Sequence, residues 1–259
     1  MTENSLRRLW KEDKAALGAW LSIPDSFSAE VMARAGYDWL CIDMQHGLVD
    51  YQRAVPMLQA ISTTPTAPVV RVPWNDPAII MKVLDAGAQA VIVPLINTRA
   101  DTELAVSACR YPPSGIRSYG PTRAGLGGGY LERAEEGVCC IPMIETASAL
   151  ENLDDILSVP GVDAVYVGPM DLSLSLGLEP KPDREGDAVY SEALGRILEA
   201  CRRHGVAAGI HAGSRMAARR VGDGFRFVLV SSDVDLLARN AARELRSARE
   251  GVEESPPAS

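Results

Sequence analysis

Short apolar runs alternate along this chain with longer amphipathic segments. Eight of the runs have the composition of buried strands, and each is followed by apolar residues at helical spacing. The predicted strands are 17–21, 37–42, 67–72, 90–94, 138–144, 162–167, 206–210 and 225–230. The predicted helices are 26–35, 51–61, 76–86, 101–110, 148–157, 190–203, 214–221 and 233–249, after a polar lead-in over residues 1–14. Such alternation indicates parallel strands joined by right-handed crossovers.

The length of the chain favours one way of arranging these elements. With 259 residues, of which 47% are hydrophobic, the chain has the usual size of a (β/α)₈ barrel. No Gly-x-Gly-x-x-Gly follows the first strand, so an open dinucleotide-binding sheet is disfavoured. We therefore predict an α/β protein with a single (β/α)₈ TIM-barrel domain over residues 1–250. Residues 251–259 are expected to be a disordered tail, and the glycine-rich stretch 125–129 a flexible part of the long loop 111–137.

Charge and composition exclude some partners. The net charge of −8 argues against nucleic-acid binding, which requires a basic surface. No apolar run approaches the ~20 residues of a membrane span, and no signal peptide is apparent at the N-terminus. The five cysteines form no Cys-x-x-Cys pair and are expected to be reduced thiols of a cytoplasmic protein.

Polar residues gather where the predicted strands end. In a barrel, the carboxyl ends of all strands meet at one mouth, where the chemistry of such proteins takes place. The strand-end residues are Trp20, Asp43, His46, Arg71, Glu145, Asp171 and His211. Apolar strands do not need ionisable groups for packing, so these residues are the candidates for function.

Two carboxylates, Glu145 and Asp171, follow successive strands. They suit Mg²⁺ or a similar hard divalent ion, which takes a few protein carboxylates and completes its coordination with water or substrate oxygens. Either acid could instead cap the following helix.

Other strand-end residues suit acid–base or anion chemistry or could contact the substrate. Arg71 offers a planar fork of donors for a carboxylate or enolate oxygen, although a structural salt bridge is an equal alternative. His46 could be a general base whose tautomer Asp43 fixes, or a structural histidine. His211 could be a second acid–base group or simply hydrogen-bond to a loop. Trp20 could be a substrate wall or a core residue.

The positions of the lysines favour one mechanism. A Schiff-base aldolase needs a lysine inside the barrel mouth. The chain has four lysines, and no predicted strand ends at one: Lys11, Lys14, Lys82 and Lys181. Metal-assisted enolisation is therefore favoured over imine chemistry.

With these residues in view, the chain resembles the HpcH/HpaI family of metal-dependent pyruvate aldolases over roughly residues 15 to 245. The motifs that carry the resemblance are 37–47 (YDWLCIDMQHG), 71–72 (RV), 83–89 (VLDAGAQ), 110–117 (RYPPSGIR), 144–145 (IE), 152–153 (NL) and 168–173 (GPMDLS). Several motifs in order over one domain are a far more specific signal than any one of them.

The resemblance implies a carbon–carbon lyase that cleaves 4-hydroxy-2-oxo acids to pyruvate, or a related 2-oxo acid, and an aldehyde. It implies Mg²⁺, Mn²⁺ or Co²⁺ on Glu145 and Asp171, and a homohexamer, a trimer of dimers, with a helix exchanged between paired subunits. Arg71 would stabilise the enolate oxygen, and His46 with Asp43 would act as acid and base. The substrate would also contact Trp20, the segment Gly168, Pro169, Met170 and Asp171, and Asp85, which matches an acid that reaches a neighbour's active site.

Two departures leave the substrate range open. Gln45 stands where some members have Glu, and Met143 where some have Gln. The loop 117–123, with Arg117 and Arg123, could shape the aldehyde side or face solvent. An oxaloacetate decarboxylase or related enolate-forming enzyme would use the same core residues. A barrel that binds a metabolite without turnover is an alternative of another class, against which the intact set of strand-end residues weighs.

Overall fold

The fold is a closed barrel of eight parallel strands, in which β1 pairs with both β2 and β8. The protein is described here from a computed structural model, which places residues 4–181 and 186–253. The strands are β1 (Ala16–Leu21), β2 (Trp39–Asp43), β3 (Ala67–Arg71), β4 (Ala90–Val93), β5 (Cys139–Ile144), β6 (Ala164–Val167), β7 (Ala207–His211) and β8 (Phe227–Ser232). The predicted (β/α)₈ barrel is confirmed.

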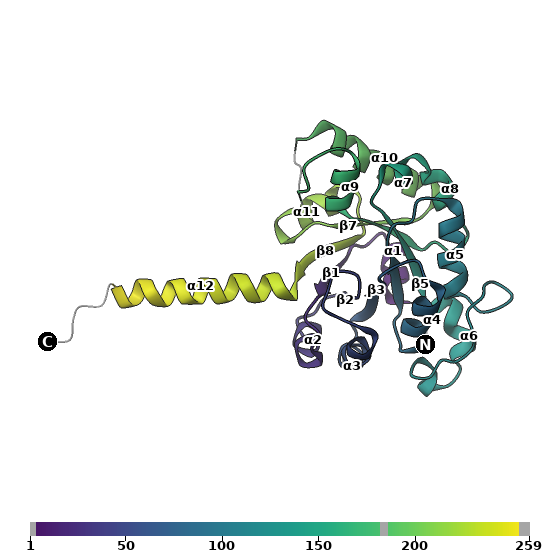
Figure 1. Cartoon of the computed structure of the whole chain (residues 1–259), viewed down its shortest axis with the longest axis horizontal. Coiled ribbons are helices and arrows are strands. Elements are labelled where there is room, and N and C mark those ends of the chain that lie inside the picture. The colour runs from purple at the N-terminus through teal and green to yellow at the C-terminus, as the bar shows by residue number, and fades with distance from the viewer. Residues whose placement is uncertain (1–3, 182–185, 254–259) are drawn as a thin grey trace.

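Helices surround the barrel, and the last one projects from it (Figure 1). They are α1 (Ser5–Lys11), α2 (Ser26–Ala33), α3 (Tyr51–Ile61), α4 (Pro77–Asp85), α5 (Arg99–Cys109), the 3₁₀ helix η1 (Ala124–Gly127), α6 (Tyr130–Gly137), α7 (Ala147–Glu151), α8 (Leu153–Leu157), α9 (Pro169–Ser175), α10 (Ala188–His204), α11 (Ser214–Asp223) and α12 (Asp233–Glu253). Within the described ranges, no helix is both long and apolar enough to cross a membrane.

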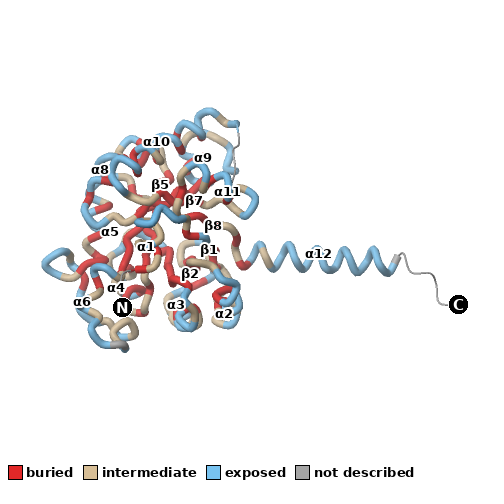
Figure 2. The backbone as a smooth tube through the Cα atoms, turned by 180° about the vertical axis from the view of Figure 1, so that it is seen from behind, coloured by how far each residue is buried: buried red, intermediate tan, exposed pale blue. Residues whose placement is uncertain are grey.

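Alternate residues of each strand point into the barrel. Trp39 and Cys41 on β2 belong to the apolar cluster inside the barrel, whereas Leu40 and Ile42 belong to the cluster between strands and helices. Side chains on a strand alternate in this way because its period is two. The buried residues follow the strands and the inner faces of the helices, while α12 is almost wholly exposed (Figure 2). The next inward position after Cys41 is Asp43, at the carboxyl end.

The structure differs from the predicted elements in four places. The predicted long loop 111–137 contains η1 and α6, and residues 148–157 form two helices, α7 and α8, instead of one. Asn152 separates α7 from α8, because its amide donates to the Asn97 carbonyl at 2.8 Å and its backbone leaves helical geometry. The additional helix α9 follows β6.

The fourth difference concerns α12. This helix continues to Glu253 and thus includes the first three residues of the predicted tail. A single glycine such as Gly251 costs a helix only about 1 kcal/mol and does not necessarily end it. The rest of the predicted tail, 254–259, lies outside the described residues.

Candidate active site

A cavity of about 550 Å³ opens at the mouth of the barrel. Its lining combines ionisable, aromatic and glycine residues from the carboxyl ends of several strands. These residues are Trp20, Ser22, Asp43, His46, Arg71, Met143, Tyr166, Gly168, Pro169, Met170, Asp171, His211 and Ser232. The predicted strand-end residues therefore meet at one place, with Glu145 buried directly behind the glycine at 168.

A second cavity, of about 570 Å³, lies beside α1 and α10, away from the mouth. Its charged side chains include Arg7 and Asp163, paired at 2.6 Å, and Arg226 and Asp13, also paired at 2.6 Å. Because these groups already neutralise each other, the mouth is the stronger candidate for chemistry.

The Arg71 guanidinium is fixed by the Asp43 carboxylate. Arg71 Nε donates to Asp43 Oδ1 at 2.9 Å and Arg71 Nη2 donates to Asp43 Oδ2 at 2.7 Å. Both residues are buried. Burial opposes ionisation of Asp43, but the hydrogen bonds and charge of Arg71 outweigh it and lower the Asp43 pKa. The pair therefore presents an oriented cation at the cavity wall.

Asp43 also shapes the turn that carries His46. Its Oδ1 accepts hydrogen bonds from the Gln45 and His46 amides, at 3.1 and 3.2 Å. Aspartate often bonds its own backbone two and three residues on in this manner. The sequence predicts that Asp43 fixes the tautomer of the His46 ring, but among the described residues no hydrogen bond joins that carboxylate to the ring. Asp43 instead orients Arg71 and the backbone of His46, whose side chain is exposed at the cavity.

The two predicted metal ligands lie close enough to influence each other. Glu145 is 2% exposed and its Oε1 accepts from the Leu95 amide at 2.7 Å. Leu95 holds this position in the left-handed region, at φ 54°. Burial raises the Glu145 pKa, and the negative charge of Asp171 raises it further, against the opposing effects of Leu95 and Arg71. A nearby cation would relieve that penalty.

The backbone at residue 168 leaves room beside Glu145. A Cβ atom at Gly168 would lie 2.7 Å from Glu145 Oε2 and 3.1 Å from the Met143 methyl group. Across the part of the chain that the structure describes, no cluster of three or more His, Cys, Asp or Glu side chains has metal-site geometry. Two carboxylates with space around them nevertheless fit an ion that takes its remaining ligands from water and substrate.

Trp20 links three other residues of the mouth. Its Nε1 donates to His211 Nδ1 at 2.8 Å, and its ring packs edge-on against Tyr166 at 5.6 Å. The Arg71 guanidinium carbon lies 4.7 Å from the centre of the Trp20 ring. Burial and the positive charge of Arg71 lower the His211 pKa to about 4, so His211 is neutral near pH 7.

Asp85 lies away from this mouth. It is the last residue of α4, which returns to the amino-terminal end of the barrel before β4. Its Oδ1 accepts from Arg117 Nη2 at 2.7 Å, and the buried Arg117 guanidinium packs 4.6 Å from the Tyr111 ring. Arg123 binds the Ala86 carbonyl at 2.8 Å at the same end. Neither arginine of the loop 117–123 lines the mouth of its own chain.

Sequence reasoning overlooked several residues of the cavity. Tyr166 stands at the inward position before Gly168, so strand alternation could have identified it. Ser22 lies just beyond the end of β1, and Ser232 is the last residue of β8. The hydrogen bond from the Leu95 backbone amide to Glu145 could not be predicted from the sequence, because any residue other than proline can supply a backbone donor.

The sequence of this chain is similar to a known protein family and to several of its members. The HpcH/HpaI aldolase/citrate lyase family model matches residues 16–240. The hydroxypyruvate/pyruvate aldolase of Rhizorhabdus wittichii is 44% identical over 249 residues, covering 95% of this chain and 99% of that protein. The 4-hydroxy-2-oxo-heptane-1,7-dioate aldolase of Shigella sonnei is 39% identical over 257 residues, covering 97% and 96%.

A solved structure shows the same architecture. The crystal structure of an HpcH/HpaI aldolase/citrate lyase family protein from Burkholderia cenocepacia superposes with a TM-score of 0.87 at 37% identity, covering 95% of this chain and 99% of that one. On sequence and fold, the chain belongs to the HpcH/HpaI aldolase/citrate lyase family.

Proposed function

We propose that this protein is a divalent-metal-dependent aldolase that cleaves 4-hydroxy-2-oxo acids to a 2-oxo acid and an aldehyde. The observation that carries the proposal is the convergence of the Asp43-bound Arg71 with the carboxylates Glu145 and Asp171 at one cavity. The similar proteins named as aldolases support the same reaction class. The 2-oxo acid is pyruvate or a closely related donor such as hydroxypyruvate.

Glu145 and Asp171 would hold the metal ion, with Mg²⁺, Mn²⁺ or Co²⁺ as candidates. When bound, such an ion supplies positive charge that polarises the 2-oxo group of the substrate. The raised pKa of Glu145 supports the assignment, because a carboxylate buried beside another is stabilised by a cation. The Gly168–Asp171 segment lines the same cavity and would contact the substrate carboxylate through its backbone.

His46 and Arg71 would carry the proton and charge movements. His46 would remove the proton from the C4 hydroxyl, and the C3–C4 bond would then break to release the aldehyde. The electron pair of that bond would move toward the 2-oxo oxygen, where Arg71 would stabilise the enolate charge. Return of a proton to C3 would complete the 2-oxo acid. Asp43 would keep Arg71 in place, and Trp20 would form part of the substrate wall.

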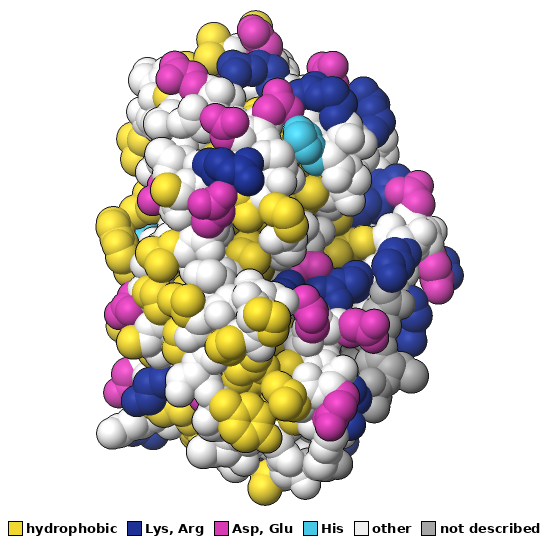
Figure 3. Space-filling view, turned by 90° about the vertical axis from the view of Figure 1, so that its right-hand side faces the viewer, with side chains coloured by type: hydrophobic (Ala, Val, Ile, Leu, Met, Phe, Trp, Pro, Cys, Tyr) yellow, Lys and Arg dark blue, Asp and Glu magenta, His cyan; other side chains and the backbone are white. Residues whose placement is uncertain are grey.

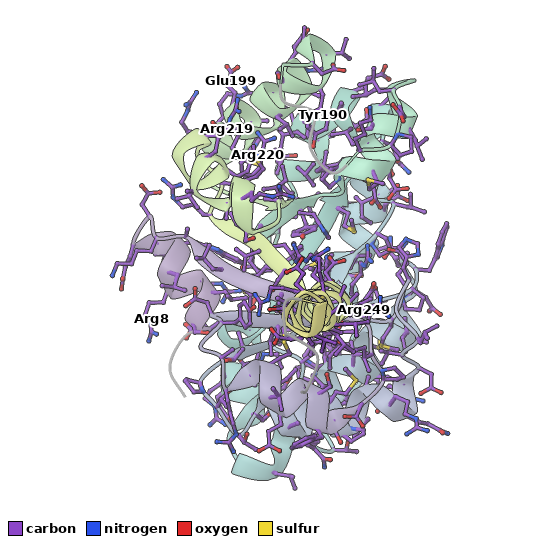
Figure 4. The ribbon with its side chains drawn as sticks, turned by 90° about the vertical axis from the view of Figure 1, so that its left-hand side faces the viewer. Arg8, Tyr190, Glu199, Arg219, Arg220 and Arg249 are labelled. Carbon is purple, nitrogen blue, oxygen red and sulfur yellow. The ribbon has the colours of Figure 1, made fainter. Side chains whose placement is uncertain are left out.

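We further propose that the protein works as a hexamer, a trimer of dimers, in the cytoplasm, with residues 1–250 as its domain. The projecting α12 supports exchange of a helix between copies, since it carries exposed Leu237, Leu245 and Val252. Figure 4 looks at α12 end-on, with Arg249 near its tip. Hydrophobic side chains also gather on the face shown in Figure 3. The helices α5 and α6 carry exposed Leu104 and Leu131. In such an assembly Asp85 would reach a neighbour's mouth.

The test is cleavage of 4-hydroxy-2-oxo acids with and without Mg²⁺ or Mn²⁺, measured by release of the 2-oxo acid. Oxaloacetate is assayed in parallel. Metal-dependent cleavage faster than oxaloacetate decarboxylation supports the proposal. Faster loss of CO₂ from oxaloacetate would instead identify a decarboxylase, and pyruvate binding without either reaction would identify a binding protein.

A further inference from the structure

The cavity contains a buried hydroxyl group with no partner in the described part of the chain. Tyr166 is 1% exposed and lines the cavity, and its hydroxyl oxygen makes no hydrogen bond to any described residue. Its ring is held edge-on by Trp20 at 5.6 Å and by Phe227 at 5.7 Å. Burying a hydroxyl without a partner costs about 1–3 kcal/mol, so a ligand group that supplied the missing partner would be favoured at this position.

His211 lines the same cavity and its tautomer is fixed. The indole N–H of Trp20 is only a donor, so His211 Nδ1 must accept at the 2.8 Å contact and cannot carry the proton. The neutral ring then carries its proton on Nε2, which makes no hydrogen bond to the described residues. Because the His211 pKa is lowered to about 4, this donor persists at neutral pH.

Trp20 joins these two groups to the residue proposed to stabilise the enolate. It touches Tyr166, His211 and the Arg71 guanidinium, whose carbon is 4.7 Å from its ring centre. The two polar groups therefore share a neighbour with the guanidinium that is proposed to stabilise the enolate. Tyr166 can accept and donate, whereas His211 Nε2 can only donate. A substrate hydroxyl, itself both donor and acceptor, suits either group.

We propose that Tyr166 and His211 form a polar subsite that binds a hydroxyl group of the substrate and selects against the analogue that lacks it. The inference rests on the proposed aldolase function and adds the substrate class: a hydroxyl on the nucleophilic carbon of the 2-oxo acid or on the aldehyde carbon beside the carbonyl. Sites built to hydrogen-bond a hydroxyl reject the unsubstituted analogue, because their own polar groups are then left unpaired.

The test compares substrates with and without the hydroxyl in four proteins: wild type, Tyr166→Phe, His211→Phe and Tyr37→Phe. Tyr166→Phe removes one oxygen and keeps the ring contacts. Tyr37→Phe is a matched control outside the cavity, where the hydroxyl bonds Ser231 at 2.8 Å. The first arm measures metal-dependent deuterium exchange at C3 of hydroxypyruvate and of pyruvate without aldehyde. The second arm measures aldol addition of pyruvate to glycolaldehyde and to acetaldehyde.

Loss of one neutral hydrogen bond corresponds to about 3- to 10-fold. We expect Tyr166→Phe to lower the preference for the hydroxylated compound by this factor in one arm, which identifies the donor or the aldehyde as its source. His211→Phe should lower the preference in the same arm, and Tyr37→Phe should leave it unchanged. An equal loss with both compounds of each arm, or no loss in either arm, would overturn the subsite.

Failure of the proposed function has a different signature. It would appear as absence of exchange and of addition in the wild type with every metal. Binding of hydroxypyruvate and pyruvate by calorimetry in the presence of Mg²⁺ then still decides the subsite. A binding preference for hydroxypyruvate that Tyr166→Phe lowers would support it, and equal affinities in both proteins would rule out the hydroxyl of the 2-oxo acid as its ligand.

Discussion

Asp43 and Arg71 are direct neighbours in register on β2 and β3, and their side chains form two parallel hydrogen bonds inside the barrel mouth. Strand pairing thus places the two Cα atoms, and alternation turns both side chains inward. The fork of the guanidinium matches both carboxylate oxygens, which a single ammonium cannot do. Residues of two strands, without any loop, therefore orient the positive charge of Arg71 at the mouth cavity.

Arg71→Lys should distinguish the effect of the positive charge at this position from the effect of the oriented guanidinium donors. We expect turnover to fall about 10²-fold, because the charge remains but the oriented donors next to the enolate oxygen are lost. The free energy of unfolding should fall by about 1.5–3 kcal/mol, since one charged hydrogen bond to buried Asp43 disappears. Steady-state kinetics and chemical denaturation measure the two effects. Full turnover in this variant would show that orientation by Asp43 is irrelevant.

Glu145→Gln should raise the unfolding temperature of the metal-free protein and abolish its metal-dependent activity. The folded-state pKa of Glu145 is raised by burial, so ionisation above the unfolded-state pKa destabilises the metal-free fold. The variant should therefore unfold at a higher temperature than wild type at pH 7–8, by about 2–4 °C for each kcal/mol relieved. At pH 4, where the wild-type carboxyl is protonated, the difference should vanish.

Metal ions provide the second readout of the same variant. Mg²⁺ or Mn²⁺ should raise the unfolding temperature of wild type but not of Glu145→Gln, because a ligand stabilises only the protein that binds it. Asp171→Asn should behave similarly toward the metal. Equal stabilisation of all three proteins, or full activity of either variant under chelator, would rule out the two-carboxylate site.

His46→Ala should lower turnover by about 10²–10⁴-fold with little change in metal affinity, as expected for loss of a general acid–base group. His204→Ala is a matched control, because His204 lies at the end of α10 and contacts Asp154 at 2.8 Å, away from the mouth. Its activity should equal that of wild type. A rate for His46→Ala as high as that of the control would remove His46 from the mechanism.

The buried imidazole of His211 should contribute to acid sensitivity. Its pKa is lowered from 6.5 to about 4 in the fold, so the unfolded chain binds the proton more readily. The stability associated with this group is complete above pH 6.5 and is lost as the pH falls from 6.5 towards 4. Denaturation midpoints across this range should decline less in His211→Phe than in wild type. Parallel declines would contradict burial of a neutral His211.

The fold could be predicted from the chain because its strands and helices have distinct periods and regular order. The alternation of side chains along each strand also explains why residues of the mouth could be predicted. Asp43, Arg71 and Glu145 occupy inward positions at strand ends. Tyr166 shares that pattern, but an aromatic residue in a strand is usually a core residue, so the pattern alone does not distinguish it. Its role depends on a missing hydrogen-bond partner, which only coordinates reveal.

Other details depended on contacts between distant segments. The sequence predicts the nearby His46 ring as the partner of the Asp43 carboxylate. In the structure, pairing of β2 with β3 places Arg71 next to Asp43, and the carboxylate binds Arg71. The sequence leaves open whether the loop around Arg117 shapes the aldehyde side or faces solvent. In the structure the Arg117 guanidinium packs against Tyr111 and binds Asp85 at the other end of the barrel. Sequence spacing does not report such tertiary partners.

Deuterium exchange of the pyruvate methyl protons, followed by NMR with Mg²⁺ or Mn²⁺ and then with chelator, tests the enolate mechanism most directly. It requires no knowledge of the aldehyde. We predict metal-dependent exchange in wild type that chelator abolishes and that Arg71→Lys slows. Absence of exchange from pyruvate and hydroxypyruvate with every metal tested would contradict enolate formation at this mouth.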